Sequence, residues 1–223
     1  MLAANEEFLK RVSEITAYVD FIRKLDSGEH KIVANQSGFP AYQHTAKEDL
    51  LRTSKASALL MLYNLMESCV TNAVEAIFDE LESESVSFDV CREEVRIVVL
   101  GNVNRHEPKK LVVGLNSLAT DIVTKSFRKA ETVSGNVDAR EIRRIASKYG
   151  FQKPRKKGER LLAVKTLRND LAHGSKSFTE VGRNFTMTDI SEITDEVVAY
   201  LTELIANVAQ YLSSKSYLSS VAG

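Results

Sequence analysis

The segment LLMLYNLMESCVTNAVEAIFDEL, residues 59–81, is apolar around most of the circumference that it would have as a helix. Neither glycine nor proline interrupts it, and its apolar residues recur at steps of three and four. A helix of this kind is normally enclosed by its neighbours. We therefore predict a buried central helix within a helical stretch over residues 45–81, with its core at Leu62, Leu65, Met66, Cys69, Val70, Ala73, Val74, Ile77 and Phe78.

Helical patterns flank this segment on both sides. Residues 6–25 carry apolar side chains at helical steps, whereas DSGEHKIVANQSGFPAYQ, residues 26–43, is predicted to be a loop. A long final helix is expected to open near Asp189, with Glu192 three residues on as a capping partner. Its apolar stripe consists of Ile190, Ile193, Val197, Leu201, Leu204, Val208 and Leu212.

The middle of the chain is less uniform. Residues 87–103 favour a helix, although the β-branched run VRIVVL leaves a strand open, and a further helix is expected over residues 116–131. A helix within residues 134–151 has Asp138 as its N-cap, Glu141 in a capping-box position and Gly150 as its stop. The next helix covers residues 159–173 and ends at Gly174.

Only three prolines and ten glycines punctuate the 223 residues, which favours long helices over many short strands. We therefore predict an all-α fold, a helical bundle with an inserted helical segment and a long C-terminal helix. The chain is expected to form one domain over residues 1–223, with the inserted helices and a basic loop at about residues 101–157.

Composition narrows the function classes. Lys+Arg and Asp+Glu both total 30, so the chain has no global field that would hold a polyanion, and RNA contact would need local clusters or paired subunits. Cys69 and Cys91 lack metal-ligand spacing and are predicted to be buried thiols in a reducing compartment. With neither a secretory-type start nor a bilayer-length apolar run, the protein is expected to be cytoplasmic and not membrane-bound.

The segment TLRNDLAHGSKSF, residues 166–178, contains the candidate site. In a helix Asn169 and His173 lie on one face with Arg168 beside them, so we expect all three on the solvent side of a helix end. A chain with 14 Arg and 4 His in 223 residues contains an Arg-x4-His pair by chance about 0.25 times, so the spacing alone is weak evidence. Arginine and histidine are also common near helix C-termini for purely structural reasons.

The chemistry of these three side chains suits metal-independent cleavage of RNA. The ribose 2′-hydroxyl is the internal nucleophile, Arg168 would stabilise charge on the phosphate, and His173 would move protons. The helix C-terminus favours the protonated imidazole, as a general acid requires. A two-fold dimer would supply the second acid–base group that a single set lacks.

Three blocks of the sequence, residues 59–81, 134–151 and VKTLRNDLAHGSKSFTEVGR at 164–183, resemble the HEPN superfamily, in its large stand-alone prokaryotic subfamily. The resemblance implies a HEPN-like helical bundle that dimerises, with the R-x4-6-H segments forming a composite ribonuclease site. It assigns phosphate binding to Arg168, a supporting polar role to Asn169 and proton transfer to His173. It also implies a toxin–antitoxin or phage-defence setting, with an antitoxin or another defence-system protein as a possible partner.

One position departs from the family pattern. Some HEPN toxins carry a tyrosine two residues beyond the histidine, which a partner nucleotidyltransferase modifies. This chain has Ser175 there, so the resemblance does not extend to that modification.

Other residues are weaker candidates. Glu67 stands alone among apolar neighbours and either supports the site or belongs to a buried pair. Asn136 is expected to cap rather than to catalyse. A basic run could track RNA backbone or be a solvated loop, and it comprises Lys153, Arg155, Lys156, Lys157 and Arg160. No metal or nucleotide motif is present, so no cofactor is predicted.

Two non-catalytic functions remain open from the sequence. The chain could be a helical binding module that uses the groove for nucleotide, RNA or a protein, or an interaction subunit of a defence complex whose C-terminal stripe docks another chain. The intact set of Arg168, Asn169 and His173 favours the endoribonuclease.

Overall fold

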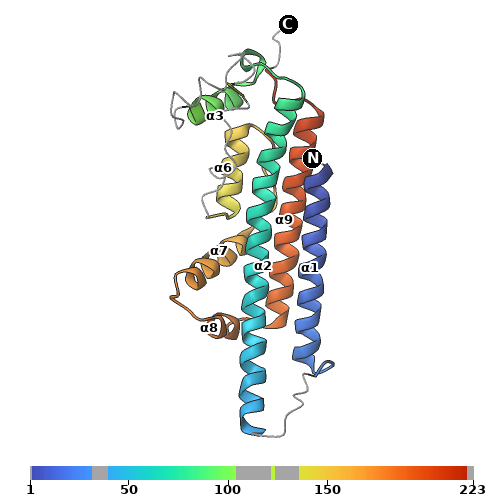
Figure 1. Cartoon of the computed structure of the whole chain (residues 1–223), viewed down its shortest axis with the longest axis vertical. Helices are drawn as coiled ribbons and strands as arrows, with labels where there is room; N and C mark the ends of the chain where they lie inside the picture. The colour runs from blue at the N-terminus through green and yellow to red at the C-terminus, as the bar shows by residue number, and fades with distance from the viewer. Residues whose placement is uncertain (1, 32–39, 104–121, 124–135, 220–223) are drawn as a thin grey trace. The chain divides into compact units, whose positions relative to one another are not determined.

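The computed structural model describes residues 2–31, 40–103, 122–123 and 136–219 (Figure 1). Within these residues every regular element is helical, and extended backbone pairs only in an isolated antiparallel bridge between Cys91 and Leu218. The prediction of an all-α fold is confirmed.

The described residues group into two compact units. Unit 1 consists of Met1–Asn5, Glu67–Lys157 and Tyr200–Gly223. Unit 2 consists of Glu6–Met66 and Gly158–Ala199. The two longest helices each contribute one part to each unit, and these are α2 (Pro40–Ser83) and α9 (Met187–Ser213).

Unit 2 has an aliphatic core between helices that are far apart in the sequence. Besides its parts of α2 and α9, it contains α1 (Leu2–Ser27) from Glu6 onward, α7 (Glu159–Ala172) and α8 (Phe178–Arg183). α1 buries Ile15, Val19 and Ile22, which lie at the helical steps seen in the sequence. The predicted helix over residues 6–25 is therefore confirmed, with a slightly longer extent at both ends.

α2 is the central helix that the sequence predicts. All nine of its predicted core residues between Leu62 and Phe78 are buried. The predicted loop over residues 26–43 is wrong at both ends, because α1 continues to Ser27 and α2 already begins at Pro40. Proline suits the first turn of a helix, since the N–H that it lacks would have no intrahelical partner there.

Unit 1 combines the second part of α2 and the end of α9 with three short helices. These are the 3₁₀ helix η1 (Phe88–Val90), α3 (Glu93–Val103) and α6 (Ala139–Tyr149). The run VRIVVL is helical within α3, so the helix predicted there is confirmed and the strand alternative is wrong. The helix predicted over residues 116–131 lies outside the described residues except for Ile122 and Val123, which are helical.

The ends of α6 agree with the sequence. The side chain of Asp138 accepts a hydrogen bond from the backbone N–H of Glu141 at 2.8 Å, as an N-cap does. Gly150 has a φ of 81° and ends the helix in the left-handed conformation. Next to this end, Arg92 donates to the carbonyls of Gly150 at 2.9 Å and of Ser216 at 3.1 Å, so one guanidinium joins three segments of unit 1.

The start of α9 differs from the prediction in one respect. The side chain of Asp189 accepts a hydrogen bond from the backbone N–H of Thr186 at 2.8 Å, and the Asp189 N–H donates to the Thr186 hydroxyl at 3.1 Å. The helix therefore begins at Met187, close to the predicted opening, but the capping partner is Asp189 and not Glu192. The carboxylate of Glu192 instead binds Arg160 of α7.

Both cysteines are free and buried, as predicted. Burial raises the pKa of the Cys69 thiol to about 12 and that of the Cys91 thiol to about 11. Neither thiol is therefore a ready nucleophile near neutral pH.

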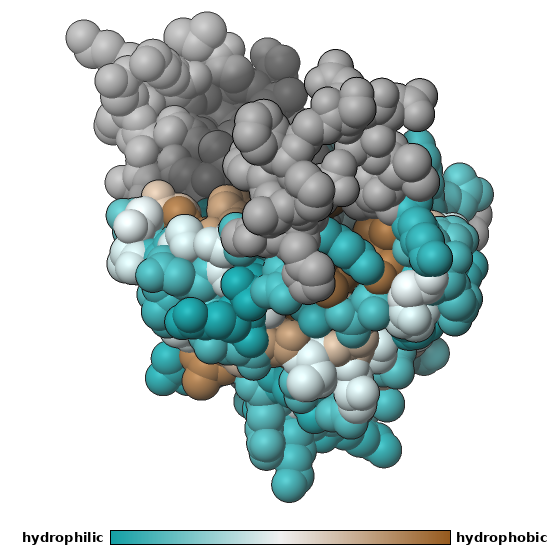
Figure 2. All heavy atoms as spheres, turned by 90° about the horizontal axis from the view of Figure 1, so that it is seen from below, coloured by the Kyte–Doolittle hydropathy of each residue, from teal (hydrophilic) through white to brown (hydrophobic). Residues whose placement is uncertain are grey.

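The outer surface is polar with scattered apolar side chains. On the face shown in Figure 2, hydrophobic residues form small separate patches among hydrophilic ones. None of the helices in the described ranges combines the length and the hydropathy that a bilayer-spanning segment needs. The exposed large apolar residues are Leu9, Phe21, Leu50, Val90, Ile97, Leu100, Leu162 and Phe178.

α8 packs very closely on α2 within unit 2 (Figure 1). A Cβ atom placed on Gly182 of α8 would lie 1.8 Å from the carbonyl oxygen of Arg52 on α2. Such a separation is far below van der Waals contact, and backbone atoms cannot move aside as a flexible side chain can. Only glycine fits at this crossing, which fixes the segment that follows α7.

We expect Gly182→Ala to lower the free energy of unfolding by about 1–3 kcal/mol, because the added methyl group must push α8 away from α2. Gly101→Ala is the matched control, since a Cβ at this helical glycine of α3 would meet no atom within 4 Å. The control should raise stability by about 0.5–1 kcal/mol through helix propensity. Equilibrium unfolding in urea measures both variants, and a Gly182→Ala protein as stable as wild type would contradict the close crossing.

Candidate functional site

The C-terminal end of α7 is closed by a well-defined cap. The backbone N–H of Gly174 donates to the carbonyl of Leu171 at 3.2 Å, and Gly174 has a φ of 68°. The backbone N–H of Ser175 donates to the carbonyl of Asp170 at 3.0 Å. These two bonds form a Schellman motif and make His173 the C-cap residue. The imidazole of His173 is exposed, and the cap fixes the backbone that carries it.

Arg168 lies on a different side of α7 from His173. The two residues are five positions apart, which places their side chains about 140° apart at about 100° per residue. His173 is exposed, whereas Arg168 is half-buried on the side of α7 that also carries the buried Leu161 and Val164. The expectation that all three candidate residues share the solvent side is therefore wrong for Arg168.

The side chain of Arg168 contacts the central helix α2. Its guanidinium carbon lies 4.7 Å from the centre of the Tyr63 ring, and the Tyr63 side chain is 0% exposed. An arginine above an aromatic face at this distance makes a cation–π contact. The contact compensates in part for removing the charge from water, and it joins the motif helix to the central helix.

Asn169 links Arg168 to His173. Its side-chain oxygen accepts a hydrogen bond from Nη1 of Arg168 at 3.1 Å, and its backbone carbonyl accepts one from the His173 N–H at 3.0 Å. The half-buried amide thus lies between the inner and the outer face of the helix. The structure brings the three predicted residues together through Asn169, although not on one face.

The residues after His173 are ordered by Asp170. Its carboxylate accepts a hydrogen bond from Nζ of Lys176 at 2.6 Å, and its backbone carbonyl also accepts one from the hydroxyl of Ser175 at 3.0 Å. The hydrogen bond from Lys176 is the main reason why the pKa of Asp170 lies below its usual value. Ser175, at the position of the modifiable tyrosine of some HEPN toxins, therefore has a local structural partner.

A second cap, at Ser177, starts the next helix. Ser177 accepts a hydrogen bond from the backbone N–H of Glu180 through its hydroxyl at 3.2 Å, and its own N–H donates to the Glu180 carboxylate at 2.7 Å. This reciprocal capping box starts α8. Only four residues, 173–176, lie between α7 and the Ser177 cap, so the end that carries His173 is held from both sides.

Glu67 belongs to unit 1, whereas Arg168, Asn169 and His173 belong to unit 2. It lies on α2, is half-buried, and accepts a hydrogen bond from the Thr71 hydroxyl at its backbone carbonyl at 2.9 Å. Its supporting role stays a prediction.

The residues of the basic run are also divided between unit 1 and unit 2. Its first four members lie in unit 1 and have exposed side chains, and these are Lys153, Arg155, Lys156 and Lys157. Their loop is held by its backbone, because the N–H groups of Arg155 and Lys156 donate to the Glu203 carboxylate at 2.8 and 3.3 Å.

Arg160 lies in unit 2 and forms ion pairs with Glu192 and Glu196 of α9. These two carboxylates would compete with phosphate for this guanidinium. RNA contact by the run stays a prediction, and it is better suited to the four exposed members than to Arg160.

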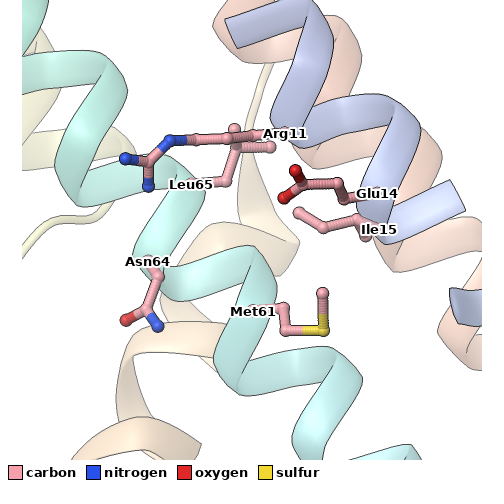
Figure 3. Close-up of a pocket in the computed structure, with 6 residues that line it drawn as sticks. All are labelled: Arg11, Glu14, Ile15, Met61, Asn64 and Leu65. Atoms are coloured by element: carbon pink, nitrogen blue, oxygen red, sulfur yellow. The ribbon is translucent and has the colours of Figure 1, made fainter. Parts of the chain in front are cut away.

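A separate pocket of about 160 Å³ lies between α1 and α2 in unit 2 (Figure 3). Arg11 reaches from α1 across to α2 in this view, and Glu7 already pairs with it at 2.6 Å. No feature of the sequence marks these positions as special, and we assign no function to the pocket. Its lining residues are Arg11, Glu14, Ile15, Met61, Asn64 and Leu65.

Tyr63 is the residue at the site that sequence reasoning misses. It lies inside the apolar run of the central helix, where an aromatic residue is expected as core. Its contact with Arg168 joins positions 105 residues apart, and helical spacing predicts neighbours only within one helix.

Comparison with known families supports the resemblance seen in the sequence. Residues 4–217 match the family described as HEPN_MAE_28990-like HEPN, which covers almost all of the chain. No curated protein and no solved structure matches the chain.

We expect Gly174→Ala to destabilise the fold by about 1–2 kcal/mol and to shift the His173 imidazole resonances, because alanine is strained at positive φ. Steric contact does not contribute, since nothing lies within 4 Å of a Cβ at this position. Gly174→Asn is the matched control, because asparagine tolerates the left-handed conformation at a helix end. Thermal unfolding and NMR of the imidazole measure the effect, and equal behaviour of the two variants would argue against the Schellman cap.

Proposed function

Because the chain belongs to the HEPN superfamily, as a member of the HEPN_MAE_28990-like HEPN family, we propose that it is a metal-independent endoribonuclease. The observation that carries this proposal is the end of α7, where Asn169 connects a half-buried arginine to an exposed histidine at a fixed cap. A phosphate binder and a proton-transfer group are thus held on one short rigid element.

The proposed reaction uses the RNA itself as nucleophile. The 2′-oxygen attacks the adjacent phosphorus and loses its proton to a general base, while the bond from phosphorus to the 5′-oxygen breaks. A general acid gives a proton to that departing oxygen. The products are one strand with a 2′,3′-cyclic phosphate and one with a 5′-hydroxyl, so atoms and charge balance without any other reactant.

Each of the three residues has a distinct role in this proposal. The guanidinium of Arg168 binds the non-bridging phosphate oxygens and stabilises the extra negative charge of the transition state. The imidazole of His173 transfers protons, for which its exposure on the outer face of α7 gives access. Asn169 orients the guanidinium through the 3.1 Å hydrogen bond.

A homodimer completes the proposed site. Each chain supplies one histidine at its α7 end, whereas the reaction needs one group that takes a proton and another that gives one. The outer face of α7 carries two exposed residues in line with His173, and these are Leu162 and Thr166. Such a stripe suits packing against the same stripe of a second copy.

Family membership also supports a biological setting. We infer a cytoplasmic toxin or phage-defence effector, for which an antitoxin or another defence-system protein would limit RNA cleavage. Ser175 gives no phenolic hydroxyl for modification at the position next to Gly174, so control by a binding partner is the route that we favour.

The purified protein is expected to cleave RNA in the presence of EDTA and to leave cyclic-phosphate ends. His173→Ala should lower kcat/KM by about 100- to 10,000-fold, and Arg168→Ala by about 100- to 1,000-fold. His30→Ala and Arg23→Ala are the matched controls, because these exposed residues of unit 2 have no role in the proposed site. RNA with 2′-O-methyl groups should bind without being cleaved, since its nucleophile is blocked.

Two results would overturn this assignment. Equal cleavage by wild type and by both site variants would mean that another site or a contaminating nuclease acts. Absence of cleavage by wild type, with retained binding of the 2′-O-methyl RNA, would favour the non-catalytic binding module.

Dimerisation makes a separate prediction. We expect specific activity to fall on dilution together with the solution mass, because a lone subunit holds half of the proposed site. Leu162→Glu, at a residue 52% exposed on α7, should weaken both, whereas Leu9→Glu, at a residue 56% exposed on α1, should weaken neither. Light scattering and cleavage assays over a dilution series measure this, and full activity of a monomer would refute the composite site.

A further inference from the structure

The connection between α7 and α8 continues the exposed surface on which His173 lies (Figure 1). Each residue from Ala172 to Phe178 is exposed, and caps hold both ends of this segment. Among the exposed large apolar side chains of the residues that the structure describes, two are aromatic, Phe21 and Phe178. Phe21 lies on α1, whereas Phe178 follows the proposed proton-transfer group by five residues and is 36% exposed.

We propose that Lys176 and Phe178 form a nucleotide subsite, which binds an unpaired nucleotide next to the scissile phosphate. The ammonium group of Lys176 binds the phosphate of that nucleotide, and the ring of Phe178 stacks on its base. The inference rests on the proposed function and names its substrate class as single-stranded RNA, because only an unstacked base offers a free face to an aromatic side chain.

The cap at the end of α7 keeps the two residues near His173. The N–H of Lys176 donates to the carbonyl of Asp170, in the last turn of α7, at 3.4 Å. Phe178 follows two residues later, and two trans peptide units span at most about 7.6 Å between Cα atoms. The Cα atom of Phe178 therefore lies within about 13 Å of that carbonyl oxygen. Neighbouring nucleotides of one strand can bridge such a separation.

Lys176 carries a charge that a phosphate can reach. Its Nζ lies 2.6 Å from the Asp170 carboxylate, and the two side chains are 47% and 25% exposed. An exposed ion pair of this kind is weak, because water and salt screen it. The nearby Glu180 carboxylate accepts hydrogen bonds from Ser177 at the start of α8. Phosphate oxygens can therefore take the place of Asp170 at the ammonium group.

The neighbours of Phe178 favour an RNA base over a protein surface. The four residues before it are small or polar, and these are Gly174, Ser175, Lys176 and Ser177. Lysine and serine are depleted at the centre of protein interfaces, whereas single-strand binding combines a positive charge with an aromatic side chain. Because every base has a flat face, stacking on Phe178 should depend little on which base is present.

Binding of an uncleavable RNA tests the ring without any need for catalysis. The probes are single strands of 2′-O-methyl RNA that each carry one 2-aminopurine base at a different position. Wild type and Phe178→Tyr should quench the fluorescence at one position, whereas Phe178→Leu should lose this quenching and bind about tenfold more weakly. Phe21→Leu is the matched control, because it removes an exposed ring of unit 2 and should bind like wild type.

Salt dependence tests the lysine. Lys176→Gln should lower the slope of log Kd against log salt by about 0.7, as expected for one phosphate contact to a single strand. Lys24→Gln is the matched control, because Lys24 forms an exposed ion pair with Asp20 at 2.7 Å, and it should leave the slope unchanged. Asp170→Asn should tighten binding about two- to fivefold, because the competing carboxylate is removed.

Several results would overturn the subsite. These are absence of position-specific quenching by wild type, which needs no variant, an unchanged salt slope in Lys176→Gln, or weaker binding in Asp170→Asn. A lower solution mass of Phe178→Leu in light scattering, with unchanged RNA affinity, would assign the ring to contact between two copies. Equal affinity for duplex RNA would refute the substrate class. Position-specific quenching by a protein that cleaves no RNA would refute the proposed function while the subsite stands.

Discussion

The cation–π contact of Arg168 with the buried ring of Tyr63 is the interaction on which the candidate site depends. A half-buried charge needs partners, and the aromatic face of Tyr63 is one of the partners of Arg168. The same contact ties the motif helix α7 to the central helix α2, so the site and the core of unit 2 share one interaction.

The remaining constraints at the site are helix ends. The Schellman motif stops α7 at His173, and the capping box at Ser177 starts α8 almost at once. The close approach of Gly182 to Arg52 then fixes α8 on α2. A histidine on a long loop would sample many positions, whereas this one lies between two caps and has little backbone freedom.

Much of this arrangement can be predicted from the sequence, because helices are determined by local patterns. The central helix, the cap at Asp138 and the stop at Gly174 all depend on residues within one turn of each other. The orientation of Arg168 was predicted wrongly, because residues close in the sequence were assumed to lie on the same face of the helix. The contact with Tyr63 could not be predicted, since it depends on how two distant helices pack.

The cap at His173 has a consequence for the spacing of the motif. Because α7 is regular from Arg168 to its end, the number of intervening residues acts as an angular setting between an inner anchor and an outer proton carrier. Adding or removing one residue would turn the imidazole by about 100° around the helix axis and would shift it by about 1.5 Å along it. The register between arginine and histidine is therefore a geometric constraint of this fold, in addition to the hydrogen bonds made by the intervening side chains of Asn169 and Asp170.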